Sequence, residues 1–162
     1  MKTDFTIRQA QQSDAVELKE LFQNTVLVIN RRDYSQAEVE DWASCGNNLS
    51  NIKERIETHC FVVAVNQQSQ IVGFSSITPQ GYLHSMFVHK DFQGEGIATM
   101  LLEEIERYTI TAGITRITSE VSLTARPFFE KKGYVVEKEQ KRKANQLSLT
   151  NFLMAKEVAF LE

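Results

Sequence analysis

Val88-His89-Lys90-Asp91-Phe92-Gln93-Gly94-Glu95-Gly96-Ile97-Ala98-Thr99 is the stretch that decides the fold of this chain. An apolar strand runs into a short polar loop, and two glycines then open a long amphipathic helix. At such a junction several backbone N–H groups have no helical partner, and the helix dipole adds about half a positive charge. Glycine at 94 and 96 removes the side chains that would hold an anion away from those amides. The loop therefore suits a phosphate or a pyrophosphate.

A glycine pair at this place can also serve the turn geometry alone, because the Gly-x-Gly pattern is weak by itself. A Rossmann fingerprint needs a third glycine near position 99, where this chain has Thr99, although Glu120 is tolerably placed as the ribose acid. The loop follows an antiparallel meander, and no second strand–helix–strand unit appears. Dinucleotide enzymes and methyltransferases are therefore disfavoured, and the missing Gly-Lys-Ser/Thr disfavours a P-loop.

Three apolar segments upstream of the loop predict the meander. They are expected at 60–65, 71–77 and 82–89, and short polar or Pro-Gly turns separate them. Strands joined by such short turns run antiparallel. Downstream, apolar residues at helical spacing predict a long helix over 94–112, which Gly113 ends.

The outer segments complete a mixed α/β sheet. Ser35-Gln36-Ala37-Glu38 fits a capping box that opens one helix. Only the strand–helix–strand unit around Gly94 must be parallel. The other expected elements are a strand at 5–8, helices from 13 or 14 to 29, at 35–42 and at 51–57, a strand at 116–122, a helix at 125–132 and a closing hairpin of 134–141 and 146–155.

Composition bounds the domain count and the partners. The 162 residues are 42% hydrophobic and 24% charged, with a net charge of −3, which predicts one domain over 1–160 and no nucleic-acid partner. No apolar run approaches the ~20 residues of a membrane span, and no signal peptide opens the chain. Cys45 and Cys60 match no metal-ligand spacing, so we expect them to be reduced thiols in a cytoplasmic protein. The protein is expected to be either a monomer or a homodimer. Leu161-Glu162 could be an expression-vector remnant.

Two motifs resemble the GNAT (GCN5-related) N-acetyltransferase family. Its acetyl-CoA loop reads Gln/Arg-x-x-Gly-x-Gly/Ala, and Gln93-Gly94-Glu95-Gly96-Ile97-Ala98 satisfies every position. A second signature appears as Ser122-Leu123-Thr124-Ala125-Arg126-Pro127-Phe128-Phe129-Glu130-Lys131-Lys132-Gly133-Tyr134. The residues of this motif resemble those of the YafP-like branch. The resemblance implies the GNAT acyl-CoA N-acyltransferase fold, an antiparallel meander plus a central parallel strand pair flanked by helices. It also implies acetyl transfer from acetyl-CoA to a primary amine of a small molecule or a protein, by direct attack in a ternary complex without a metal.

The resemblance also implies a cofactor site. In this family the meander strand before the loop is splayed from the next parallel strand, and the pantetheine arm lies between them. Carried over, that strand offers the backbone of Met86, Phe87 and Val88, and Ser122 stands where many relatives have an Asn that touches the pantetheine. The pyrophosphate would be held by Gln93, Gly94, Glu95, Gly96, Ile97, Ala98 and Thr99.

The catalytic groups are less clearly indicated. Where many relatives have a Tyr that protonates the leaving thiolate, this chain has Phe129, which leaves the general acid to water or to an unidentified group. His84 is a candidate base, because its unperturbed pKa of about 6.5 lies near working pH. Strand alternation places Tyr82, His84, Met86 and Val88 on one face. Glu120 is the competing carboxylate, or the group that orients the imidazole, and a histidine bonded only within the sheet is the simpler alternative.

The acceptor side has three candidates and no identified substrate. Tyr34 and Trp42 are large aromatics near a helix start, able to line a pocket or stack on a cation, and Asn151 lies on the last strand. A structural role is the simpler interpretation of each. Because Phe129 replaces the expected acid, a non-catalytic acyl-CoA binding or sensing module is the alternative function, with a dinucleotide enzyme a distant third.

Overall fold

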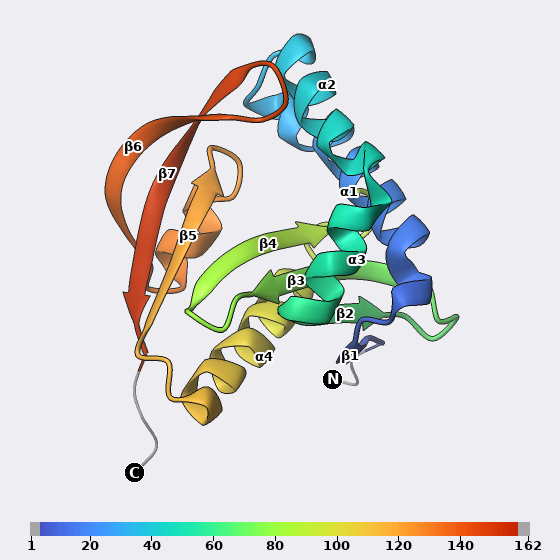
Figure 1. The fold of residues 1–162 in the computed structure, drawn as a ribbon, viewed down its shortest axis with the longest axis vertical. Helices are drawn as coiled ribbons and strands as arrows, with labels where there is room; N and C mark the ends of the chain where they lie inside the picture. The colour runs from blue at the N-terminus through green and yellow to red at the C-terminus, as the bar shows by residue number, and fades with distance from the viewer. Residues whose placement is uncertain (1–3, 159–162) are drawn as a thin grey trace.

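A seven-stranded mixed sheet with the order β1-β2-β3-β4-β5-β7-β6 runs through the computed structural model, which describes residues 4–158. Figure 1 shows this sheet with helices on both faces. The proposed remnant at 161–162 and the end of the predicted domain lie outside the described residues. The main elements are β1 Thr6–Gln9, α1 Ala15–Val28, α2 Gln36–Ser44, α3 Leu49–Thr58, β2 Cys60–Val65, β3 Ile71–Ile77, β4 Tyr82–Val88, α4 Ile97–Ala112, β5 Arg116–Ser122, α5 Arg126–Lys131, β6 Val135–Lys143 and β7 Ser148–Glu157.

The predicted meander is confirmed. β2, β3 and β4 pair antiparallel in chain order, and every residue of β3 is buried. A strand buried on both faces has no polar side to show, so these segments appear in the sequence as nearly continuous apolar runs. The mixed α/β architecture with one parallel pair, β4 with β5, agrees with the predicted fold class.

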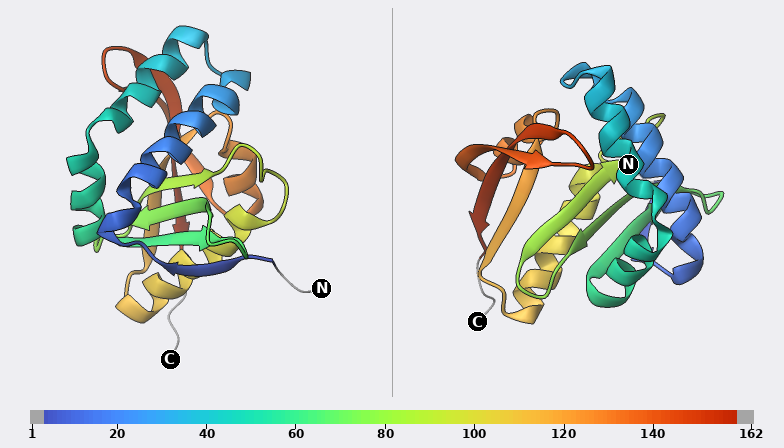
Figure 2. Two further views of the ribbon diagram at one scale, coloured as in Figure 1. Left: turned by 90° about the vertical axis from the view of Figure 1, so that its right-hand side faces the viewer. Right: turned by 45° about the horizontal axis from the view of Figure 1, so that its top comes forward.

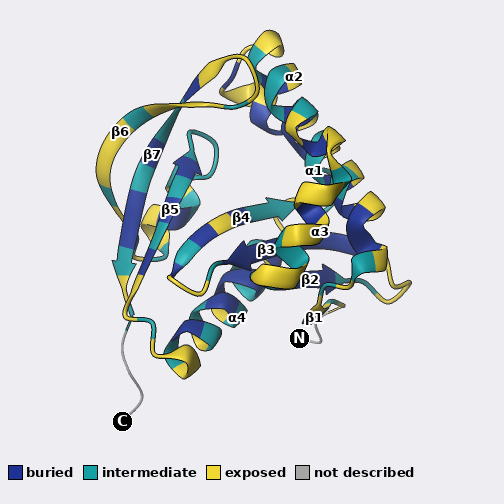
Figure 3. Ribbon diagram, viewed as in Figure 1, coloured by how far each residue is buried: buried dark blue, intermediate teal, exposed yellow. Residues whose placement is uncertain are grey.

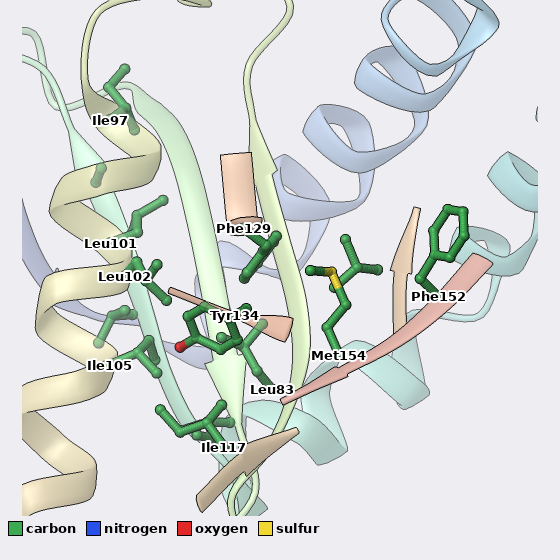
Figure 4. Close-up of a cluster of buried hydrophobic side chains, with 14 of the residues drawn as sticks. Leu83, Ile97, Leu101, Leu102, Ile105, Ile117, Phe129, Tyr134, Phe152 and Met154 are labelled. Atoms are coloured by element: carbon green, nitrogen blue, oxygen red, sulfur yellow. The ribbon is translucent and has the colours of Figure 1, made fainter. Parts of the chain in front are cut away.

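Helices cover the meander from two sides (Figure 2). α4 packs on one face, where Leu101 and Ile105 are fully buried beside Ile117 of β5. This cluster also contains Phe129 and Tyr134, as Figure 4 shows. α1 and α3 pack on the opposite face through a second cluster, which consists of Ala15, Leu18, Leu21, Ile52, Phe61, Val63, Ile71 and Phe74. A third, smaller cluster of Val26, Tyr34, Val39, Ala43 and Leu149 joins the N-terminal helices to the C-terminal hairpin.

Local capping sets the helix boundaries. Ser35 Oγ accepts the N–H of Glu38 at 3.1 Å, and the Glu38 carboxylate accepts the N–H of Ser35 at 2.9 Å, so the predicted capping box opens α2. The long helix begins at Ile97 rather than at Gly94, because Gly94 and Gly96 have φ values of 76° and 82°. Those left-handed conformations cannot continue a right-handed helix, so the predicted start was three residues early.

The C-terminal hairpin closes the sheet in an order that local sequence does not specify. β7 inserts between β5 and β6, and its pairing with β5 runs from Arg116↔Glu157 to Ser122↔Asn151. β6 is then the exposed edge, and it alternates Lys, Arg and Glu side chains that discourage pairing with another chain (Figure 3).

The tip of the hairpin contacts the N-terminal helices. Asp41 of α2 accepts the backbone N–H groups of Asn145, Gln146 and Leu147 at 2.9–3.1 Å. Within residues 4–158, no helix combines the length and apolarity that a membrane crossing requires. Cys45 and Cys60 are both free.

Candidate functional site

β4 and β5 part after two residue pairs. They pair in parallel only at Tyr82↔Thr118 and Leu83↔Ser119, where Ser119 Oγ donates to the Leu83 carbonyl at 2.8 Å. Farther along, the strands separate, and a cavity of about 830 Å³ opens between them. The cavity is lined by β4, the end of β5, the start of α4, α5, the N-terminal helices and the C-terminal hairpin. The splay expected from the family resemblance is therefore present.

Backbone groups of β4 point into this gap. Val88 lies opposite Gly73 of β3, and the next N–H, that of His89, donates back to β3 at 2.8 Å. This pattern marks Gly73–Val88 as a non-hydrogen-bonded pair, so the amide and carbonyl of Val88 point away from β3. Met86, two residues earlier, has the same orientation. Phe87 directs its backbone toward β3 instead, which leaves Met86 and Val88 as the residues with main-chain groups facing the cavity.

The glycine loop leaves the N-terminus of α4 open. Gly94 and Gly96 both have positive φ, and a Cβ on either would meet no other atom within 4 Å. Glycine is therefore required here by conformation, while the space beyond it stays free for a ligand. Gln93 Nε2 donates to the Val88 carbonyl at 2.8 Å and braces the loop against β4. The first N–H groups of a helix have no intrahelical partner, so the start of α4 has the geometry that suits an anion.

His84 sits in a bulge of β4. Ser76 pairs with Ser85 and Ile77 pairs with Leu83, so His84 has no partner on β3. The predicted alternation of faces is wrong at this point, because the extra residue resets it. Leu83 packs in the α4 cluster on the same face as Met86, rather than on the opposite face with Ser85. The bulge turns His84 toward α3 and into the cavity.

The environment of His84 keeps its imidazole neutral. The His84 side chain is exposed, but it is exposed to the cavity, whose walls surround the ring. Loss of hydration lowers the pKa of His84 to about 4. The positive charge of Arg55 acts in the same direction, as does His59 when it is protonated, and Glu120 opposes them. The His59 ring lies at 5.7 Å between ring centroids and the Tyr82 ring at 6.1 Å. At physiological pH the imidazole therefore has a free nitrogen lone pair, and its low pKa makes it a weaker base than an ordinary histidine.

Glu120 is held in a network of its own. Its Oε2 accepts Arg142 Nε and Gln140 Nε2, each at 2.6 Å, and its Oε1 accepts the Tyr82 hydroxyl at 3.3 Å. Both carboxylate oxygens are thus occupied, and within residues 4–158 no hydrogen bond joins Glu120 to His84. The arrangement favours a role in positioning the wall of the cavity over a role as the first proton acceptor.

Comparisons with known proteins agree with this geometry. A family model described as "Acetyltransferase (GNAT) domain" matches residues 30–157. The chain belongs to the GNAT acetyltransferase family. It is 29% identical over 149 residues to the Escherichia coli (strain K12) protein described as an uncharacterized N-acetyltransferase, YafP, covering 91% of this chain and 93% of that one.

Solved structures share the fold. A GCN5-related N-acetyltransferase from Rhodopseudomonas palustris superimposes with a TM-score of 0.92 at 25% identity, covering 98% of each chain. The PaiA N-acetyltransferase from Thermoplasma acidophilum, solved in complex with coenzyme A, gives a TM-score of 0.78 at 18% identity and covers 96% of this chain and 99% of its own. Over nearly its whole length, the chain therefore has the fold of solved GNAT acetyltransferases.

The structure brings the predicted site residues of this GNAT domain together in one cavity. Its lining includes His84 and Glu120, the β4 residues, the loop from Gln93 to Thr99, Ser122 and Phe129. Glu95 alone among the predicted loop residues is absent from the lining, and its side chain is exposed.

Phe129 occupies the place expected for a general acid. Its side chain is 2% exposed and packs edge-on against Phe128 at 5.4 Å and Tyr134 at 5.1 Å between ring centroids. Tyr134 does not replace the missing hydroxyl, because it is buried and donates to Glu106 at 2.8 Å. Burial and the Glu106 carboxylate raise the pKa of Tyr134 above its ordinary value. These two aromatic rings serve mainly as core.

We predict that Phe129→Tyr changes the chemical step only modestly, by less than about tenfold, and leaves acetyl-CoA affinity similar. A CoA thiolate can leave without a strong acid, so an added hydroxyl supplies little. Single-turnover kinetics measure the step, and Phe128→Tyr on the adjacent, partly exposed ring is the matched control. Complete loss of activity in Phe129→Tyr alone would instead show that Phe129 matters through tight packing.

The three acceptor-side candidates make structural contacts. The Tyr34 hydroxyl donates to the Thr150 carbonyl at 2.6 Å and accepts the Leu123 N–H at 2.9 Å, so it joins the N-terminal helices to the hairpin. Trp42 packs edge-on near Tyr34 at 5.8 Å between centroids. Asn151 Oδ1 accepts Gln140 Nε2 at 3.0 Å. All three predicted residues line the cavity, and with its hydroxyl occupied Tyr34 offers a substrate only its ring.

Sequence reasoning missed part of the cavity wall. Arg55 of α3 lines the main cavity, and His59 lies one turn later beside His84. Thr124 Oγ1, also in the lining, is buried without a hydrogen-bond partner among the described residues. A basic residue four positions before a histidine is visible in the sequence, but only the packing of α3 beside β4 gives that spacing a meaning.

Proposed function

We propose that this protein transfers an acetyl group from acetyl-CoA to a primary amine of a small molecule or a peptide. The observation that carries the proposal is one continuous cavity that joins the open N-terminus of α4, the splayed β4–β5 gap and the neutral imidazole of His84. A long cofactor and a separate amine can occupy such a space at the same time. The proposed route is direct attack of the amine in a ternary complex.

The residues fit acetyl-CoA in two places. Positive-φ glycines with free space around them, followed by the unpaired amides of α4, suit the pyrophosphate. The cavity-facing main-chain groups of Met86 and Val88 suit an extended amide-bearing arm, because they can pair with it as β4 would pair with another strand. The Val88 carbonyl already accepts hydrogen bonds from Thr25 Oγ1 at 3.0 Å and from Gln93 Nε2. The backbone N–H of Val88 is therefore the group left for the ligand.

The reaction requires proton removal, stabilisation of an oxyanion and departure of a thiolate. The amine nitrogen bonds to the thioester carbonyl carbon, the carbon–sulfur bond breaks, and the amine proton must leave. We assign His84 as the acceptor of that proton, directly or through water, because it is neutral and faces the cavity. A backbone N–H of the splayed part of β4 would donate to the oxyanion. Water would protonate the thiolate, since Phe129 cannot.

The test combines a binding assay with an activity assay. Acetyl-CoA should raise the melting temperature by an amount that grows with its concentration over its dissociation constant. A panel of primary amines, with release of free CoA as the readout, should contain at least one acceptor. Acetyl-CoA binding without transfer to any amine would support the acyl-CoA sensing module instead, and stabilisation by NAD but not by acetyl-CoA would overturn both.

A further inference from the structure

Arg55 is a half-buried cation without an ion-pair partner. It lies on α3 and lines both the main cavity and a smaller adjoining cavity of about 290 Å³. Burial lowers the pKa of its guanidinium. Within residues 4–158 this guanidinium makes no hydrogen bond and no salt bridge. The arginines that form ion pairs elsewhere each contact a carboxylate within 3.3 Å, namely Arg8, Arg107, Arg116, Arg126 and Arg142.

A second unsatisfied group lies one helical turn away. The Nδ1 atom of His59 is buried and has no hydrogen-bond partner among the described residues. Its ring faces that of His84 at 5.7 Å between centroids. Burial, followed by the charge of Arg55, lowers the pKa of His59, which favours the neutral imidazole with one N–H. Buried polar atoms are nearly always paired, so the orphaned atom points to a ligand.

The remaining groups of the smaller cavity do not neutralise Arg55. Its lining consists of Asn51, Glu54, Arg55, Thr58, His59, Thr78 and His84. Glu54 is exposed, and its charge acts on Arg55 from a distance, without a hydrogen bond. The other polar neighbours are uncharged donors and acceptors. An anion entering from the main cavity would therefore meet a guanidinium, an imidazole and hydroxyl groups.

We propose that Arg55 and His59 bind an oxyanion carried by the acceptor, a carboxylate or a phosphate, so that the enzyme acetylates amines that also bear an acidic group. The inference rests on the proposed acetyl transfer and names the chemical class of its second substrate. Arginine presents paired N–H donors that match the two oxygens of a carboxylate or a phosphate. His59, with its proton on Nδ1, supplies a further donor. The acid group anchors the acceptor next to His84.

The test compares acids with their neutral analogues. Probes are amino acids against their amides, and phosphoethanolamine against ethanolamine, at saturating acetyl-CoA. In the unaltered protein, kcat/KM should favour the acid of at least one pair by about 10- to 100-fold, the usual worth of a charged hydrogen bond. Arg55→Gln should bring that ratio close to one through KM, Arg55→Lys should restore part of it, and both should keep their affinity for acetyl-CoA. Lys53→Gln, an exposed change on the same helix, is the control and should keep the ratio.

Failure of this inference is distinguishable from failure of the proposed function. Equal turnover of acid and neutral amine, or an acid preference that survives Arg55→Gln, overturns the inference while acetyl transfer stands. Calorimetric binding of each pair to the CoA complex decides the matter without turnover, because equal or absent binding of acid and amide contradicts the oxyanion site. Circular dichroism and the melting temperature establish that the Arg55 variants are folded.

Discussion

Gly96→Asp should weaken acetyl-CoA binding by about 100-fold or more. The substitution places a negative charge beside the amides that would hold the pyrophosphate, and like charges brought together cost several kcal/mol. It also puts a Cβ at a φ of 82°, although the space there is open, so the fold should tolerate the change. The measurement is the dissociation constant of acetyl-CoA by calorimetry, supported by loss of the ligand-induced rise in melting temperature.

Two control variants separate charge from backbone strain. Gly96→Asn has nearly the same shape without the charge and should lose much less affinity. Gly113→Asp, at the other end of α4, meets a similar φ of 76° and equally open space, so it should strain the backbone about as much as Gly96→Asp and stay folded, without weakening cofactor binding. An unchanged acetyl-CoA affinity in Gly96→Asp would mean that the cofactor binds elsewhere.

His84→Ala should lower kcat/KM by about 10²- to 10⁴-fold while acetyl-CoA affinity stays the same. The physical reason is loss of the neutral imidazole that faces the cavity and accepts the amine proton. His84→Gln, which keeps a polar side chain of similar size in the bulge, should lose nearly as much because it cannot take up a proton. A variant that retains its rate would remove His84 from the mechanism and direct attention to water or to Glu120.

The pH dependence of the same enzyme provides an independent check. The folded-state pKa of His84 is lowered to about 4, so the imidazole stays neutral from the usual value near 6.5 down to about pH 4 and becomes protonated below that. In assays between pH 5 and 9, the protein should therefore show no His84-dependent inflection near 6.5 in kcat/KM. An inflection near neutrality that disappears in His84→Ala would contradict the environment described for this residue.

The sequence predicted the parts of the site that depend on local rules. The anion-binding loop follows from two glycines between a strand and a helix, and the meander follows from apolar runs joined by short turns. Capping chemistry predicted the start of α2 at Ser35. These features need only neighbouring residues. The meander and the start of α2 are confirmed, and the two glycines have the left-handed conformation that keeps them outside the helix, while anion binding by the loop stays a prediction. The splay of β4 from β5 came from the family resemblance, since no local pattern encodes how far two strands remain paired.

The parts that sequence could not supply depend on distant contacts. The bulge at His84 arises because β4 has one more residue than β3 between two pairs, which a strict alternation cannot anticipate. Arg55 was missed because its importance comes from where α3 docks, not from its neighbours along the chain. Tyr34 was identified as a pocket residue, but the bonds that its hydroxyl makes to β7 and to the segment after β5 were beyond local pattern.

The contact between Tyr34 and Thr150 has a consequence for the order of folding. The two residues are 116 positions apart, whereas the first pair of the meander, Cys60↔Ile77, closes a far shorter loop. Closing the longer loop costs about 2 kcal/mol more in chain entropy. During synthesis, a nascent chain that has not yet emerged past Thr150 can pair its meander, but it has no partner for the Tyr34 hydroxyl. The wall against which an acceptor would rest is therefore completed only after Thr150 has left the ribosome.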